Sequence, residues 1–153
     1  MKPRTAVTHS EQETFALARE LAERLKPGTF VLLHGELGAG KTAFVRGLAS
    51  GLGIDPDSVT SPTFVLIQQY KGAVPLIHAD LYRLESAAAV DDLGLEEIGS
   101  GGVVAVEWAE RMPRVPAGSV SVTIEDTGGD SRKITIDRAL EIPIRIGNSA
   151  LPL

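Results

Sequence analysis

The stretch Gly35-Glu36-Leu37-Gly38-Ala39-Gly40-Lys41-Thr42 matches the pattern G-x-x-x-x-G-K-[ST] at every fixed position. The apolar, β-branched run at residues 29–34 before it predicts a buried strand, and residues 43–52 after it are typical of a helix. Strand, glycine-rich loop and helix in this order predict a phosphate-binding loop, whose backbone N–H groups and helix N-terminus face an anion. A glycine-rich turn with a solvated lysine is the alternative.

Each position of this loop has an expected role. The residues expected to surround the phosphates of a nucleotide are Glu36, Leu37, Gly38, Ala39, Gly40, Lys41, Thr42 and Ala43. Lys41 is suited to contact the β- and γ-phosphates as a point charge, and the Thr42 hydroxyl to take one position on Mg²⁺. Because the chain has no N-K-x-D motif to read guanine, ATP is the expected nucleotide.

The composition is that of a globular protein with one domain. Of the 153 residues 43% are hydrophobic and 23% charged, and we expect residues 1–146 to form the domain and residues 147–153 a loose tail. The absence of cysteine excludes disulfides and thiolate metal sites. No apolar run approaches the roughly 18 residues of a membrane helix, so we expect a cytoplasmic protein without membrane association. The net charge of −5 argues against sequence-independent binding to nucleic acid.

Periodicity and turn residues predict the other elements. Ser10 and Glu13 match a capping box, which starts a helix that should run to about Leu25. The further elements are an edge strand at 6–9, a hairpin from 64–70 and 75–82, a short helix at 87–93, a turn or helix at 94–99, a buried strand at 103–108, and a hairpin from 120–125 and 133–137. Together they predict an α/β fold, a single P-loop NTPase domain whose mixed parallel and antiparallel sheet is flanked by helices.

Basic residues gather in the C-terminal hairpin and in the segment after it: Arg132, Lys133, Arg138 and Arg145. Such a group is able to bind a partner or an RNA backbone. Interspersed acidic residues favour a solvated sheet edge instead.

Two acidic residues lie near the ends of predicted strands. His78 and Asp80 project from one face of their strand, where Asp80 is a candidate for a catalytic or water-ordering acid. His78 is either its hydrogen-bonding neighbour or, more commonly for such a residue, a structural histidine. Glu107 ends the buried strand at the sheet edge where α/β proteins bind nucleotides, which favours a role on Mg²⁺ over a solvated acid. The expected catalytic residues are therefore Lys41, Asp80 and Glu107, and the expected metal ligands Thr42 and Glu107.

Residues 60–64 form a hydroxyl-rich segment around a proline. Ser61 and Thr63 are candidates for a switch-like loop that orders with ATP and loosens after hydrolysis. The same hydroxyls would equally well satisfy backbone groups at the entry to a strand. Trp108 is a candidate for a contact near the site or with a partner, the general alternative being core or interface packing.

Four segments in this order resemble one protein family: residues 35–42, 61–64, 78–84 and 106–110. Together they resemble the TsaE family, also called YjeE, over nearly the whole chain. The loop motif alone is common to many NTPases, whereas the four segments together are specific. Ala79 occupies a variable position of the third segment, and the tail at 147–153 matches no motif.

The resemblance implies a bacterial ATPase needed for the threonylcarbamoyladenosine modification of tRNAs that read codons beginning with A. Such proteins join the transferase subunit TsaD and its inactive paralogue TsaB, and ATP hydrolysis resets that complex between rounds. Contact with tRNA is then indirect, through the complex. The roles implied by the family are phosphate and Mg²⁺ contacts for Lys41 and Thr42, an Mg²⁺-side acid for Glu107, a catalytic acid for Asp80, a switch-like loop for Thr63 and an important aromatic for Trp108.

Two other functions fit the same residues. A small-molecule kinase would need an acceptor pocket and usually an arginine-bearing lid, and no segment of the sequence predicts them. A nucleotide-gated binding module would dock to a partner without hydrolysing ATP, and Asp80 and Glu107 argue only modestly against it. We therefore expect a Mg²⁺-dependent ATPase that is slow by itself.

Overall fold

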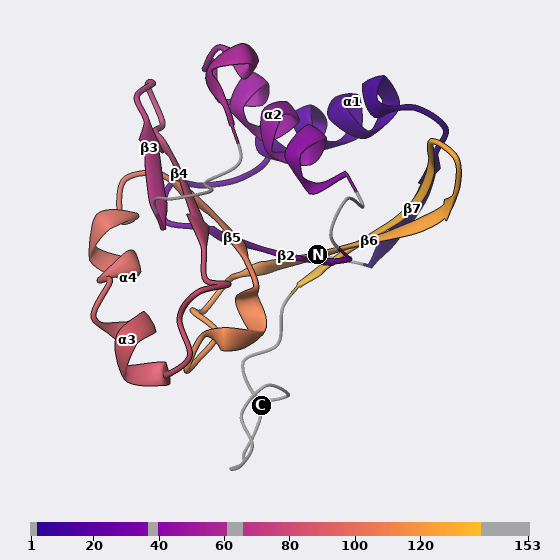
Figure 1. The fold of residues 1–153 in the computed structure, drawn as a ribbon. Helices are drawn as coiled ribbons and strands as arrows, with labels where there is room; N and C mark the ends of the chain where they lie inside the picture. Colours follow the sequence, from indigo (N-terminus) through magenta and orange to yellow (C-terminus); the bar gives the residue numbers. More distant parts are fainter. Residues whose placement is uncertain (1–2, 37–39, 61–65, 139–153) are drawn as a thin grey trace.

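The computed structural model describes residues 3–36, 40–60 and 66–138 (Figure 1). These residues form a seven-stranded sheet in the order β1-β7-β6-β2-β5-β4-β3. The strands are β1 (Arg4–Thr8), β2 (Phe30–Gly35), β3 (Ile67–Tyr70), β4 (Leu76–Asp80), β5 (Val103–Glu107), β6 (Val120–Gly128) and β7 (Ser131–Arg138). The predicted strands and both hairpins are thus confirmed, within a few residues at their ends.

The centre of the sheet is parallel and its two sides are antiparallel. Strands β6, β2, β5 and β4 run in one direction, whereas β7, β1 and β3 join through antiparallel pairs. Parallel strands end at the same edge of a sheet, so Gly35, Asp80 and Glu107 reach one edge together. The predicted mixed sheet is confirmed, and its topology brings the candidate site residues to that edge.

Helices cover the two faces of the sheet unequally. The helices α1 (Glu11–Ala22) and α2 (Lys41–Gly51) lie side by side on one face, as Figure 1 shows. The other face carries α3 (Ala87–Asp91), α4 (Leu95–Ile98) and the 3₁₀ turn η2 (Ala109–Arg111), which lie near β4 and β5. A further 3₁₀ turn, η1 (Pro56–Ser58), follows α2 and contacts it. Two apolar cores result, one around Leu33, Phe44 and Val122 and one around Leu32, Leu81 and Val106. No helix among the described residues is long and apolar enough to cross a membrane.

Two glycines allow α1 and α2 to pack with their backbones in contact. A Cβ placed at Gly47 would lie 2.3 Å from the Phe15 carbonyl oxygen, and one at Gly51 would lie 2.6 Å from the Arg19 carbonyl oxygen. Both distances are shorter than van der Waals contact, so only glycine fits. Because Lys41 and Thr42 open α2, this packing also sets the position of the candidate phosphate site.

The first helix differs from expectation at both ends. It ends at Ala22 rather than near Leu25, because the Arg24 and Leu25 N–H groups bond to carbonyls three residues back, which tightens the last turn. The Ser10 side chain caps the helix by accepting a hydrogen bond from the Glu13 N–H, as predicted. The Glu13 carboxylate, however, accepts from the His9 N–H at 2.8 Å, one residue before the cap.

Adding a methyl group at the helix contact should destabilise the protein. We expect Gly47→Ala to lower the free energy of unfolding by roughly 1–3 kcal/mol, because overpacking outweighs what alanine gains inside a helix. Urea unfolding measures the change. Gly101→Ala is the matched control, since an added Cβ there meets nothing within 4 Å. A Gly47→Ala protein as stable as this control would contradict the close packing.

Candidate functional site

The start of α2 is the centre of the candidate site. Gly40 is the N-cap of α2 and has a φ of 103°, a left-handed conformation that strains other residues. Glu36 is exposed, Thr42 is half-buried and Ala43 is buried. The expected loop residues Leu37, Gly38 and Ala39 lie outside the described residues.

Lys41 is buried between the ends of two strands. Its side chain is only 9% exposed, and its Nζ donates a hydrogen bond to the Gly35 carbonyl oxygen at 3.2 Å. The same ammonium lies 3.7 Å from the Glu107 Oε1 atom. A buried ammonium needs such partners, because water no longer solvates its charge. Lys41 is therefore held at the point where a phosphate would meet the start of α2.

Glu107 is held from two sides at the end of β5. Its Oε2 atom lies 2.7 Å from the His78 Nε2, and its Oε1 atom faces Lys41. Burial acts to raise the pKa of the Glu107 carboxyl, but the hydrogen bond and charge of His78, together with Lys41, outweigh it and lower that pKa below its ordinary value. The group is therefore an ionised carboxylate at neutral pH.

Asp80 lies beside Glu107 at the same edge of the sheet. The parallel register of β4 and β5 places the two residues directly opposite each other. The Asp80 Oδ1 atom accepts a hydrogen bond from the Tyr82 N–H at 2.9 Å, which steadies the turn after the strand. Glu107 thus pairs with Lys41 and has Asp80 as its neighbour across the two strands, although the three residues lie far apart in the sequence.

The oxygen donors at this edge suit Mg²⁺. Thr42 supplies a hydroxyl and Glu107 a carboxylate, and Mg²⁺ prefers hard oxygen ligands. Within residues 3–36, 40–60 and 66–138 no group of three or more His, Cys, Asp or Glu side chains is placed to hold a metal ion. The residues therefore fit a cation that takes most of its ligands from phosphates and water.

An aromatic pair follows the two acidic residues. Trp108 is the one described residue other than glycine with a positive φ, at 60°. The centre of its ring lies 5.0 Å from the ring centre of Tyr82, and the Arg111 guanidinium lies 5.4 Å from the Trp108 ring centre. Tyr82 is 58% exposed, which is high for a large apolar side chain. Trp108 therefore packs next to the site and beside an exposed aromatic surface.

Arg132 corrects one sequence-based expectation. The sequence favours a solvated sheet edge, but the Arg132 side chain is only 15% exposed and pairs with Asp126 at 3.3 Å. Its Nε lies 3.7 Å from the position that a Cβ on Gly40 would take, at the N-cap of α2. The pairing of β7 with β6 brings it there, and no local sequence signal marks that contact. Lys133 and Arg138 are exposed as expected, and Arg145 lies outside the described residues.

The switch-like segment is described only at its root. Ser61 and Thr63 lie outside the described residues, so their expected role stays a prediction. The Thr60 N–H donates to the Tyr70 hydroxyl at 3.3 Å, and the Arg46 Nε donates to the Val59 carbonyl oxygen at 3.2 Å. These bonds attach the start of the segment to β3 and α2.

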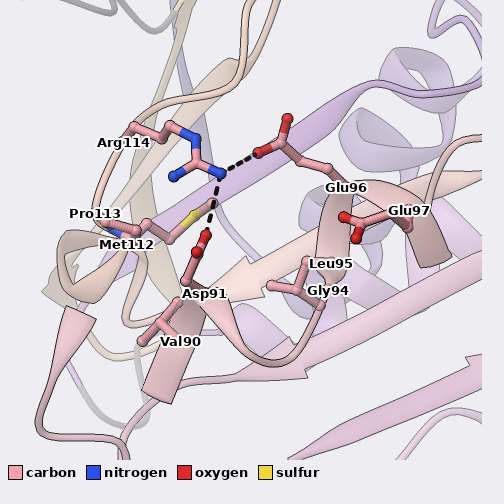
Figure 2. A pocket seen from close by; sticks show the side chains of 9 residues that line it. All are labelled: Val90, Asp91, Gly94, Leu95, Glu96, Glu97, Met112, Pro113 and Arg114. Carbon is pink, nitrogen blue, oxygen red and sulfur yellow. Dashed lines mark hydrogen bonds and ion pairs between the residues drawn. The ribbon is translucent and has the colours of Figure 1, made fainter. Parts of the chain in front are cut away.

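A small pocket lies between α3, α4 and residues 112–114 (Figure 2). Its volume of about 30 Å³ is enough for roughly one water molecule. Beside it the Arg114 guanidinium lies 3.1 Å from Asp91 and 3.3 Å from Glu96. This arrangement joins α3 and α4 to the segment after η2, and none of the pocket residues is an expected site residue.

Comparison with known proteins identifies the family. The family model described as "Threonylcarbamoyl adenosine biosynthesis protein TsaE" matches residues 8–134. The chain belongs to the TsaE family. Relatives described as tRNA threonylcarbamoyladenosine biosynthesis protein TsaE include one from Bacillus subtilis, 44% identical over 84% of this chain and 81% of the relative. One from Nostoc sp. is 44% identical over 82% of this chain and 81% of its own length.

A solved structure resembles this chain over most of its length. The crystal structure of Bacillus subtilis YdiB superposes with a TM-score of 0.69 at 37% sequence identity, over 90% of this chain and 86% of that chain. This likeness confirms the predicted P-loop NTPase fold, and the family match confirms the resemblance drawn from the sequence.

The buried carboxylate should make stability depend on pH. The folded pKa of Glu107 lies below its ordinary value of 4.5, so its contribution is complete above about that pH and is lost as the pH falls through the lower folded value. We expect Glu107→Gln to be less stable than wild type at neutral pH, with a difference that shrinks in acid. Urea unfolding at a series of pH values measures it.

Glu85→Gln is the matched control, because it removes an exposed carboxylate outside the site. Its stability relative to wild type should not follow this pH course. A Glu107→Gln difference that stays constant from neutral to acidic pH would contradict an ionised, partnered Glu107.

Proposed function

We propose that this protein binds and hydrolyses ATP with Mg²⁺, and thereby serves tRNA threonylcarbamoyladenosine modification. The observation that carries the proposal is the buried Lys41 at the start of α2, held 3.7 Å from the Glu107 carboxylate. A lysine on a helix N-terminus beside a strand-end acid is the arrangement that P-loop NTPases use on a nucleotide. The family membership of the chain supports the same site.

Each residue of the site has a proposed role in hydrolysis. The backbone N–H groups of residues 36–43 and the Lys41 ammonium bind the β- and γ-phosphates, and Thr42 and Glu107 hold Mg²⁺. When bound, Mg²⁺ supplies positive charge against the phosphate oxygens. Asp80 orients the attacking water, and Ser61 and Thr63 belong to a loop that responds to the γ-phosphate.

The proposed partners come from the family rather than from a surface of this chain. The relatives are named for tRNA threonylcarbamoyladenosine biosynthesis. We propose that ATP hydrolysis resets a complex of TsaB and TsaD in the cytoplasm. The net charge of −5 supports contact with tRNA through that complex rather than by a broad basic surface of its own. We propose that His78 and Trp108 lie next to the nucleotide site or contact a partner.

Removal of the buried ammonium should abolish tight nucleotide binding. We expect Lys41→Ala to lose both ATP affinity and phosphate release, because the phosphates lose their cationic partner. Calorimetry and a free-phosphate assay measure the two effects. Lys71→Ala, which removes an exposed lysine of the β3–β4 turn, is the matched control. Undiminished ATP affinity in Lys41→Ala would contradict the site.

Partners should accelerate the reaction. We expect slow phosphate release from Mg-ATP by the protein alone and faster release with TsaB and TsaD, with Lys41→Ala as the blank. A rate of phosphate release that the partners do not change would indicate an independent enzyme, and transfer of phosphate to an acceptor would indicate a kinase. No release under either condition would indicate a nucleotide-gated binding module and contradict the proposal.

A further inference from the structure

His78 is a buried polar residue inside an otherwise apolar part of the sheet. Its exposed fraction is 0%, and Leu76, Ile77 and Ala79 of the same strand are also buried. A buried imidazole without hydrogen bonds costs stability that an aliphatic side chain would avoid. Its Nε2 is hydrogen-bonded to the Glu107 Oε2 at 2.7 Å, while Nδ1 has no partner among the described residues.

The register of β4 and β5 shows that this hydrogen bond is not a simple neighbour contact. Asp80 is the residue directly opposite Glu107, and the residue opposite His78 is Ala105. Ala105 is small, which leaves room beside it for the imidazole to extend diagonally to the next residue on its face, Glu107. The Glu107 carboxylate thus turns back along β5 toward His78.

The two oxygens of Glu107 have separate partners. His78 holds Oε2, and Oε1 is left facing Lys41 at 3.7 Å. A glutamate side chain has several rotatable bonds, and a buried hydrogen bond to one oxygen restricts where the other can point. Histidine and carboxylate pairs of this kind orient metal ligands in many proteins, where the outer partner sets the geometry of the inner one.

We propose that His78 is the positioning residue of the nucleotide site. Its Nε2–H fixes one oxygen of Glu107, so that the other faces Lys41 and the Mg²⁺ that Glu107 holds in the proposed function, on which this inference rests. His78 itself touches neither the nucleotide nor the cation. Because Nε2 carries a proton in both the neutral Nε2–H form and the charged form, the role does not depend on titration of the ring.

Two substitutions separate this role from a general role in the core. His78→Leu removes the donor and keeps an apolar side chain of similar size, whereas His78→Gln places a side-chain amide donor near the former Nε2. Ile77→Ala is the matched control, because it weakens the packing of the same strand on the opposite face of the sheet. Thermal unfolding of each variant records its stability.

The readout is the Mg²⁺ concentration that gives half of the Mg²⁺-dependent increase in binding of a fluorescent ATP analogue. We expect His78→Leu to raise that concentration about tenfold or more. Binding of the analogue in EDTA should be unchanged, because Lys41 and the loop remain. His78→Gln should recover most of the loss, and Ile77→Ala should lower stability without moving the Mg²⁺ midpoint.

A folded His78→Leu protein with the wild-type midpoint would overturn the proposal, and so would a His78→Gln protein as impaired as His78→Leu. Wild-type protein whose ATP binding shows no Mg²⁺ dependence would instead contradict the proposed function, and this inference with it. The two failures are therefore distinguishable.

A second measurement needs no variant and no nucleotide. In nitrogen-15-labelled wild-type protein, long-range proton–nitrogen correlation reports which ring nitrogen of His78 carries a proton. We expect a protonated Nε2. An unprotonated Nε2 would overturn the proposal even if His78→Leu does not fold.

Discussion

A lysine and a glutamate that bury their charges together hold the candidate site, and much of the fold serves to make them meet. Lys41 comes from the first turn of α2 and Glu107 from the end of β5, and their side chains are about a tenth exposed. Neither charge would be tolerated there alone. The close packing of α1 on α2 fixes the position of Lys41, and the parallel pairing of β2 with β5 fixes the position of Glu107. The site is thus a property of the whole domain.

The buried pair also bears on the proposed phosphate binding, which it would allow without a large desolvation penalty. Lys41 already lacks most of its water; it donates a hydrogen bond to the Gly35 carbonyl oxygen and forms an ion pair with Glu107. An entering phosphate therefore replaces one set of polar contacts with another instead of stripping water from the ammonium. Buried ion pairs add little net stability compared with apolar packing, so a binding role accounts better for this one than a structural role.

The parts of the molecule that could be predicted from the sequence are those set by local patterns. The strand, loop and helix around Lys41 follow from glycine spacing and apolar runs, and the position of Glu107 follows from the apolar strand before it. The link between His78 and Glu107 depends on the register of two strands about thirty positions apart, which no local pattern specifies. The prediction for Arg132 is wrong for the same reason, because only the pairing of β6 with β7 brings it beside Gly40.

The order of strands in the sheet has a consequence for synthesis on the ribosome. β2 lies between β5 and β6, and both of these come from the second half of the chain. The strand that carries the phosphate loop is therefore complete long before either neighbour exists. Until residues 103–128 emerge, β2 lacks the two strands that flank it. Its apolar residues and unpaired edges then favour aggregation of the nascent chain. The proposed nucleotide site is then completed late, after almost the whole domain has been made.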